Sequence, residues 1–311
     1  MPKISIVGAG MTGATAAHWL AERGLGDLVL VDVIEGMPQG KGLDMLEAMP
    51  IISRDVEIVG SNDFAATRGS DIIILTAGLP RKPGMSRDDL LSANAEIVGK
   101  AATETLKHSP DAIYIVLTNP LDTMAYLTMM LTKLPRGRVI GQAGVLDSAR
   151  MRAFVAQETG ISVENIQCYV LGGHGDEMIP LTRHSNVAGI PLNEYLPADK
   201  LEAIVNRTRK GGGEIVNLLK TGSAFYAPSA AVAQMTEAIL KDRNLVLPCS
   251  AYMQGEYGLQ DIFFGVPVVL NRKGIDRIVE YKLSTDEQAL FDKSAAAVRE
   301  THDALKKLVK I

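Results

Sequence analysis

The stretch that decides the fold lies near the start of the chain, where a β-branched run leads into a glycine-rich turn. The run reads Ile4-Ser5-Ile6-Val7, the turn reads Gly8-Ala9-Gly10-Met11-Thr12-Gly13, and a helical pattern follows over residues 12–23. The first glycine permits a tight turn, the second lets the backbone approach a pyrophosphate, and the third lets helix and strand pack closely. Three turn glycines without a ligand are the alternative, but their place between a strand and a helix favours a dinucleotide site.

Asp32 strengthens this interpretation. It ends the second strand-like run, LVLVD, about 20 residues after the glycines, where a carboxylate can accept hydrogen bonds from both ribose hydroxyls of adenosine. The same charge would repel a 2′-phosphate, so we expect NAD rather than NADP. An aspartate that only caps the next turn is the alternative reading of Asp32 by itself.

The first half alternates strands and helices. Its near-continuous apolar runs indicate strands buried on both faces of a parallel sheet. The expected strands are Lys3–Val7, Leu28–Val31, Val56–Val59, Asp71–Leu75, Ile113–Leu117 and Arg138–Ile140, and the expected helices include Thr12–Arg23 and Asn94–His108. This order predicts an α/β fold with a doubly wound parallel Rossmann sheet, which we assign to residues 1–144.

The second half, residues 145–311, predicts an α+β substrate or catalytic domain. The expected elements are a strand Ile166–Gly173, helices Ala198–Leu219 and Ala224–Lys241, a hairpin of Leu245–Met253 with Ile262–Leu270, and a final helix Thr285–Lys310. One stripe of that last helix carries its apolar side chains, which we expect to pack on the same domain: Leu290, Phe291, Ala295, Val298, His302, Leu305 and Val309.

Composition narrows the class of protein. The 311 residues are 47% hydrophobic and carry a net charge of −4, which excludes wholesale disorder and gives no global attraction to nucleic acid or an anionic membrane. The longest weakly polar region, 112–132, is interrupted by polar residues and a proline, so we expect no membrane-spanning helix there.

The N-terminus resembles a signal peptide, but its glycines argue against one. We expect a soluble, cytoplasmic protein in which Cys168 and Cys249 are buried free thiols rather than a disulfide.

Four segments carry groups suited to chemistry on an acidic carbonyl compound. The first segment, 77–87, follows a core strand and contains the cations Arg81, Lys82 and Arg87. This composition suits a mobile lid that closes on an anion, and a solvated basic loop is the alternative. The second, 117–122, places Asn119 at the carboxyl edge of the sheet, where open α/β sheets bind ligands.

The third and fourth segments supply an acid/base pair. Asp147 and Arg150 are one helical turn apart, which puts a carboxylate and a guanidinium on one face; a surface ion pair is the alternative. His174 is surrounded by glycines at a strand end, the setting expected of a general acid/base. The remaining histidines lack that setting, and three of them fit helix surfaces or edges: His18, His108 and His302. No histidine pair has zinc spacing, so we expect no metal.

With these segments in view, the chain resembles the lactate/malate dehydrogenase family, and within it the malate dehydrogenases of the lactate-dehydrogenase-like type. The motifs that carry the resemblance are GAGMTG, AGLPRKPGMSR, TNPLD, LDSAR and GGHGD, in the family's order and spacing, and it extends to the final helix. The resemblance implies NAD as cofactor. It places cofactor contacts on residues 8–13 and Asp32, and also on Asn94, Leu117, Thr118 and Asn119.

The resemblance also implies an activity, the reversible hydride transfer between malate and oxaloacetate that belongs to the tricarboxylic acid cycle, with NADH delivering the hydride to the C2 carbonyl of oxaloacetate. His174 would exchange the proton, and Asp147 would hold its far nitrogen. Arg150 would grip the C1 carboxylate of the substrate, Arg87 would stabilise charge on the carbonyl oxygen, and Asn119 would add a polar contact. Arg81 would pair with the C4 carboxylate and reject pyruvate, because the methyl of pyruvate would leave that cation unpaired.

Two alternatives remain open at this point. A lactate or other 2-hydroxyacid dehydrogenase differs mainly at Arg81, and a non-catalytic NAD-binding sensor would need no acid/base pair. The family also implies a homo-oligomer, a dimer or a tetramer, and no residue pattern distinguishes the two. The expected partner is a small dicarboxylate, with no nucleic acid and no membrane.

Overall fold

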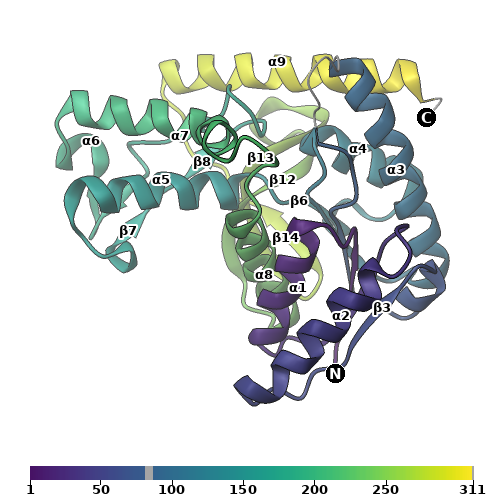
Figure 1. Cartoon of the computed structure of the whole chain (residues 1–311). Coiled ribbons are helices and arrows are strands. Elements are labelled where there is room, and N and C mark those ends of the chain that lie inside the picture. Colours follow the sequence, from purple (N-terminus) through teal and green to yellow (C-terminus); the bar gives the residue numbers. More distant parts are fainter. Residues whose placement is uncertain (81–86, 310–311) are drawn as a thin grey trace.

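A single mixed sheet forms the centre of the molecule. The computed structural model describes residues 1–80 and 87–309, apart from the side chain of Arg87 (Figure 1). In this part of the chain the sheet has nine strands in the order β14-β13-β12-β6-β5-β4-β1-β2-β3. Their bounds are β1 Lys3–Val7, β2 Asp27–Val31, β3 Ile58–Ser61, β4 Ile72–Leu75, β5 Ile113–Val116, β6 Val139–Gly141, β12 Leu245–Gln254, β13 Gln260–Asn271 and β14 Gly274–Ile278.

Strands β1 to β6 are parallel and follow the 3-2-1-4-5-6 order of a doubly wound sheet. The register aligns their carboxyl ends, since Val7 lies opposite both Val31 and Leu75, and Val116 lies opposite Leu75 and Gly141. The loops that leave these strands therefore meet at one edge. Beyond β6 the sheet continues with antiparallel strands, so the second half of the chain adds β12, β13 and β14 to the same sheet.

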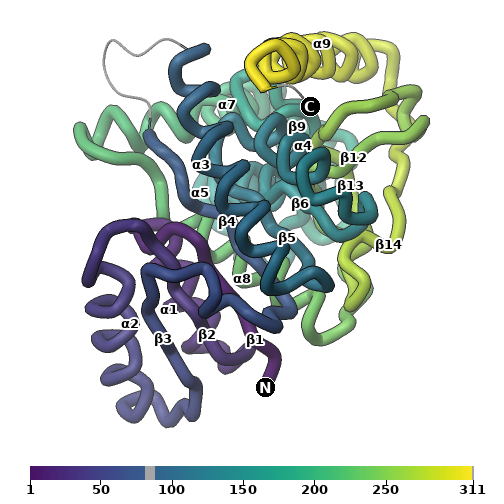
Figure 2. Tube along the Cα trace, turned by 90° about the vertical axis from the view of Figure 1, so that its right-hand side faces the viewer, coloured from purple at the N-terminus to yellow at the C-terminus, as the bar shows by residue number. Residues whose placement is uncertain are grey.

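Helices cover both faces of this sheet (Figures 1 and 2). Their bounds are α1 Met11–Glu22, α2 Met37–Ala48, α3 Arg87–His108, α4 Leu121–Thr132, α5 Gly144–Thr159, α6 Leu192–Tyr195, α7 Ala198–Leu219, α8 Tyr226–Leu240 and α9 Thr285–Leu308. Short 3₁₀ turns are η1 Met49–Ile52, η2 Phe64–Thr67, η3 Arg136–Arg138, η4 Val163–Asn165 and η5 Glu256–Gly258. Two small sheets join β7 Ile166–Gln167 with β10 Asn186–Val187 and β11 Ile190–Pro191, and β8 Val170–Leu171 with β9 Ile179–Pro180.

The sheet divides the hydrophobic core into two layers, and each central strand contributes side chains to both of them. Along β4, Ile72 and Ile74 belong to the layer that α1 and α8 cover, whereas Ile73 and Leu75 belong to the layer under α3 and α4. This alternation explains why the strands read as continuous apolar runs, because successive side chains point to opposite and equally buried faces. The predicted doubly wound fold with an α+β second half is confirmed.

Most expected elements are present within one or two residues of their expected ends. The helices α2, α4 and the short α6 were not expected, and α5 was expected only as the single turn 147–150. Nearly every residue of α4 is buried, so it has no polar face to reveal a period of 3.6, and α2 carries two internal glycines. The prediction of a single strand over 166–173 is wrong. There the chain changes partner, because β7 pairs with β10 and β8 with β9, and the N–H of Tyr169 between them bonds to Ser185 Oγ (3.0 Å).

The stripe on α9 is largely confirmed, and Leu290 is the exception. Leu290 is exposed rather than buried, because it lies beyond the face that contacts the sheet. His302, expected at a helix surface or edge, is only 2% exposed. Its ring packs edge-on against Tyr126 with centroids 4.7 Å apart, and its Nδ1–H donates to the carbonyl of Val298 (2.8 Å). Burial lowers the pKa of His302 to about 4.

Two further expectations concern the cysteines and the membrane. Cys168 and Cys249 are both buried and free, as expected. No helix in the described ranges has the length and apolar character that a bilayer crossing requires.

We predict that His302 makes the protein acid-sensitive. The unfolded chain binds a proton at His302 near pH 6.5 and the folded chain only near pH 4, so stability falls as the pH drops through this window. The loss amounts to roughly 3 kcal/mol, at about 1.4 kcal/mol per unit of pKa shift. Urea unfolding of wild type and His302→Gln at pH 7 and pH 4.5 should give a smaller pH effect in the variant. Equal effects in both proteins would contradict the prediction.

Candidate active site

The glycine-rich turn is closed by tight backbone contacts at its first and last glycines and is open at its middle glycine. Gly8 has a φ of +104°, which favours glycine, and a Cβ on Gly13 would lie 1.8 Å from the carbonyl oxygen of Gly8. The position of Gly10, by contrast, is open, with no atom within 4 Å of a Cβ placed there. Helix α1 begins directly after Gly10 and has no side-chain cap, so its first N–H groups remain available to phosphate oxygens.

Asp32 lies beside this turn, at the end of β2. Its Oδ2 accepts the N–H of Ala9 (2.7 Å) and its Oδ1 accepts the N–H of Ile34 (3.0 Å). An ionised carboxylate offers about four acceptor positions, so two remain for ribose hydroxyls. Lys41 of α2 also holds the turn, because its Nζ donates to the carbonyl of Ala9 (2.6 Å). Sequence reasoning missed Lys41 because it missed α2.

Asn94 joins the loops that leave β4 and β5. The N–H of Leu79 donates to its Oδ1 (2.7 Å), and its Nδ2 donates to the carbonyl of Asn119 (2.7 Å). Asn94 is buried, so its amide is engaged by backbone groups of the protein itself. Its assignment as a cofactor contact stays a prediction, and the geometry gives it a structural role as well.

The residues at the end of β5 lie beside the loop that follows β4. Leu117 and Thr118 are buried, and Thr118 Oγ1 donates to the carbonyl of Ala77 (2.7 Å). Asn119 is exposed. The three predicted cofactor and substrate positions therefore lie at the carboxyl edge of the sheet, next to the glycine-rich turn, although their contacts with ligands stay predictions.

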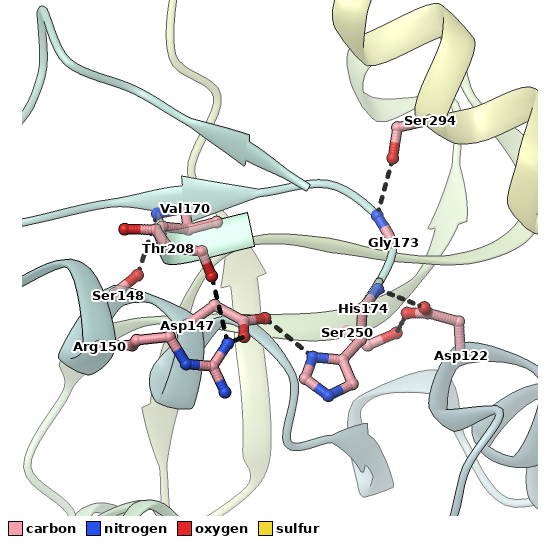
Figure 3. A network of polar contacts seen from close by, with 10 residues as sticks. All are labelled: Asp122, Asp147, Ser148, Arg150, Val170, Gly173, His174, Thr208, Ser250 and Ser294. Carbon is pink, nitrogen blue, oxygen red and sulfur yellow. Dashed lines mark hydrogen bonds and ion pairs between the residues drawn. The ribbon is translucent and has the colours of Figure 1, made fainter. Parts of the chain in front are cut away.

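Asp147 brings the predicted acid/base residues together (Figure 3). It lies in the first turn of α5 and is 2% exposed. Its Oδ2 is 2.8 Å from Nδ1 of His174, and its Oδ1 accepts Nη1 of Arg150 (3.1 Å). A carboxylate at this distance accepts rather than donates, so Nδ1 of the neutral imidazole carries the proton and Nε2 is left to face a ligand. The His174 side chain is 18% exposed.

The environment favours the protonated form of His174. Burial alone would lower the pKa of this imidazole, but the charge of Asp147 and the hydrogen bond to it outweigh that effect, with a further contribution from Asp122. The pKa of His174 is therefore raised above its ordinary value. An imidazole whose protonated form is stabilised by a buried carboxylate suits general acid/base chemistry.

Three helices hold the segment 170–174, which runs from β8 into the loop that carries His174, each through a hydrogen bond to its backbone (Figure 3). Ser148 Oγ of α5 accepts the N–H of Val170 (2.9 Å), Ser294 Oγ of α9 accepts that of Gly173 (3.0 Å), and Asp122 Oδ2 of α4 accepts that of His174 (2.9 Å). Sequence reasoning did not assign these anchoring roles, which appear only once the helices are packed.

Arg150 lies against the middle of α7. Its side chain is 10% exposed, and Nη1 also approaches the carbonyl of Thr208 (3.4 Å). A Cβ on Gly211 would lie 2.3 Å from Cδ of Arg150 and 2.6 Å from Nε, so only glycine permits this approach. In the described part of the chain no hydrogen bond reaches Nη2, which leaves a donor edge for an anion.

Two predicted residues fall outside this description. Arg81 lies outside the described residues, and α3 begins at Arg87, whose side chain is likewise not described. Among the residues that the structure covers, no group of three or more His, Cys, Asp or Glu side chains could hold a metal ion.

Comparison with known proteins matches both halves of the chain to one family. Residues 2–141 match the NAD binding domain of lactate/malate dehydrogenase, and residues 144–309 match the lactate/malate dehydrogenase alpha/beta C-terminal domain. The malate dehydrogenase of Roseiflexus sp. strain RS-1 is 60% identical over 305 residues, 98% of this chain and 99% of that protein.

Solved structures agree with this match. The malate dehydrogenase of Cryptosporidium parvum superposes with a TM-score of 0.96 at 45% identity, over 98% of this chain and 99% of that one. The lactate dehydrogenase of the same organism, solved with lactic acid and nicotinamide adenine dinucleotide, superposes with a TM-score of 0.95 at 38% identity, over 98% of each chain.

The predicted family, an oxidoreductase with NAD as its cofactor, is thus confirmed by matches that span nearly the whole chain. The glycine-rich turn and Asp32 lie in the half that matches the NAD binding domain, and the pair of Asp147 with His174 lies in the other half. The chain belongs to the lactate/malate dehydrogenase family.

Proposed function

We propose that the chain is an NAD-dependent malate dehydrogenase that interconverts malate and oxaloacetate, with His174 as proton donor and acceptor. The observation that carries the proposal is the 2.8 Å contact between Nδ1 of His174 and the buried carboxylate of Asp147. A protein that only senses NAD would need neither a protonated imidazole nor a buried carboxylate hydrogen-bonded to it. Relatives that are 51–60% identical and bear the name malate dehydrogenase support the choice of substrate.

NAD would be held by the glycine-rich turn, by the free N–H groups of α1 and by the two remaining acceptor positions of Asp32. When bound as NADH, it supplies the hydride for the carbonyl carbon of the substrate. We assign cofactor binding to a domain of residues 1–144 and proton transfer to a substrate domain of residues 145–311. Loop residues 117–119, at the carboxyl edge of β5, would complete the cofactor contacts together with Asn94.

His174 moves the proton at Nε2. Asp147 fixes the ring through Nδ1, so Nε2–H of the imidazolium can donate to the carbonyl oxygen of oxaloacetate. In the reverse direction, neutral His174 accepts the hydroxyl proton of malate at the same nitrogen. The nearby carboxylate stabilises the imidazolium in both directions and does not itself take up the proton.

The substrate carboxylates and carbonyl oxygen need cations and hydrogen-bond donors. Arg150 faces the site with a free donor edge and would bind the C1 carboxylate. Arg87 would stabilise the charge that develops on the carbonyl oxygen, and Asn119 would add a polar contact. Arg81 would pair with the C4 carboxylate, and this last assignment determines the choice between oxaloacetate and pyruvate.

We also propose that the active form is a homo-oligomer, a dimer or a tetramer. Helix α2 supports this, because its buried residues are only Pro38 and Gly42, and it leaves Leu43 and Leu46 exposed. A second copy could cover these side chains.

The substrate assignment predicts a strong preference for oxaloacetate over pyruvate when NADH oxidation is followed with each. An unpaired, desolvated Arg81 should cost roughly 2–5 kcal/mol with pyruvate, a factor of about 30 or more in kcat/KM. In Arg81→Gln the preference should collapse, while Lys82→Gln, its neighbour in the chain, should retain it. A wild-type preference for pyruvate would refute malate dehydrogenase and favour lactate dehydrogenase, the runner-up. Inactivity with both, in protein that binds NADH, would favour the sensor.

The contact of Gly211 with Arg150 predicts a pair of contrasting variants in α7. Gly211→Ala should displace the guanidinium and lower kcat/KM for oxaloacetate on the order of 10- to 100-fold, because misplacement of a binding group is costly. Gly213, two residues on, has open space around it, so Gly213→Ala should leave activity unchanged and stabilise the helix by about 1 kcal/mol. Steady-state kinetics and thermal melts check both variants, and equal kinetics would contradict the role of Gly211.

A further inference from the structure

Asp122 is a buried carboxylate next to the proton-transfer site, and the mechanism above does not use it. It lies in the first turn of α4, where TNPLD passes from β5 into the helix, and it is 6% exposed. Its Oδ2 accepts the backbone N–H of His174 (2.9 Å), and its Oδ1 accepts the hydroxyl of Ser250 on β12 (2.6 Å). Figure 3 shows it on the side of the imidazole away from Asp147 and Arg150.

The hydrogen bonds around Asp122 fit an ionised carboxylate. A backbone N–H can only donate, so Oδ2 must be an acceptor. A protonated Asp122 would have to donate to Ser250, whose own hydroxyl would then need another acceptor, and the described residues offer it no further bond. The N-terminal end of α4 also favours negative charge. Burial, with a smaller contribution from the charge of Asp147, keeps the pKa of Asp122 above its ordinary value, although the bonds from Ser250 and His174 oppose that rise.

Asp122 changes the balance of charge in the buried site. Asp147 and Arg150 form an ion pair, so their charges largely cancel. When His174 takes up a proton, the buried group of three would carry a net positive charge, which is costly where water is excluded. Asp122 forms no ion pair within the described part of the chain, so its charge is available to balance the imidazolium.

We propose that Asp122 is a second carboxylate of the proton-transfer site, a positioning residue that fixes His174 through its backbone and stabilises the imidazolium by its charge. This inference rests on the proposed function of His174. Among the described residues, the charges that act on the imidazole are Asp147 and Arg150 from α5 and Asp122 from α4, while Asp176 and Glu177 lie on its own loop. Asp176 and Glu177 are exposed, and Glu177 pairs with Lys293 of α9 (2.9 Å). Asp122 and Asp147 are therefore the buried anions among them.

The test compares Asp122→Asn, which keeps the shape and an acceptor but removes the charge, with Ser294→Ala. The control removes another anchor of the same loop without changing any charge. Oxaloacetate reduction needs protonated His174, so its rate falls as the pH rises through the pKa of this group. In Asp122→Asn the falling limb of kcat/KM should move toward lower pH by about half a unit or more, the size expected for loss of a nearby charge. In Ser294→Ala the pH at which kcat/KM falls should stay at its wild-type value.

Titration of the His174 imidazole by proton NMR gives a second readout that does not depend on turnover. The signal is identified by its loss in His174→Asn, and its midpoint should shift in the same direction as the limb. If Asp122→Asn does not fold, Ser250→Ala provides the test, because Asp122 then loses a donor and protonates more readily; the midpoint should shift the same way by a smaller amount.

An unmoved NMR midpoint in the Asp122 and Ser250 variants would overturn the proposal, because it would mean that Asp122 carries no charge. An equal shift in Ser294→Ala would also overturn it, because holding the loop would then explain the effect. Absence of wild-type turnover with oxaloacetate would instead contradict the proposed function, while the NMR titration would still report on Asp122.

Discussion

The site depends on one buried carboxylate. Asp147 is almost completely removed from water, yet it accepts from both His174 and Arg150, which offsets the free-energy cost of burying its charge. This arrangement requires α5 to begin very close to its neighbours. A Cβ on Gly144, its first residue, would lie 2.8 Å from Cβ of Pro248 on β12 and 2.9 Å from the carbonyl of Val170 on β8. The close approach at Gly144 brings the carboxylate of α5 to the loop of His174.

The rest of the site follows from how the sheet aligns its strands. Parallel β1, β2, β4 and β5 end at one edge, so the glycine-rich turn, Asp32 and Asn119 gather there from distant parts of the sequence. Antiparallel β12 joins the same sheet beside β6 and brings Ser250 to Asp122. The sheet therefore joins the residues proposed to bind the cofactor with those proposed to transfer the proton.

Residues whose role is set by local geometry could be predicted from the sequence. Gly8 and Gly13 are needed by the turn itself, Asp32 ends a strand, and Asp147 and Arg150 are one helical turn apart. Roles that depend on how distant helices pack were missed, as with the bonds of Asp122 and Lys41 and the approach of Gly211 to Arg150. The extent to which individual side chains are buried was also hard to predict. The stripe on α9 is visible in the sequence, but the full burial of His302 depends on Tyr126 from another helix.

In the proposed reaction His174, held by Asp147, exchanges the proton with the substrate. The most direct measurement is turnover and NADH binding of His174→Asn, made on the same preparation. Turnover with oxaloacetate should fall by roughly 100- to 10,000-fold, the contribution typical of a general acid, while the dissociation constant for NADH stays at its wild-type value. Retained turnover in this variant would contradict the account, because the proton would then have to come from another group.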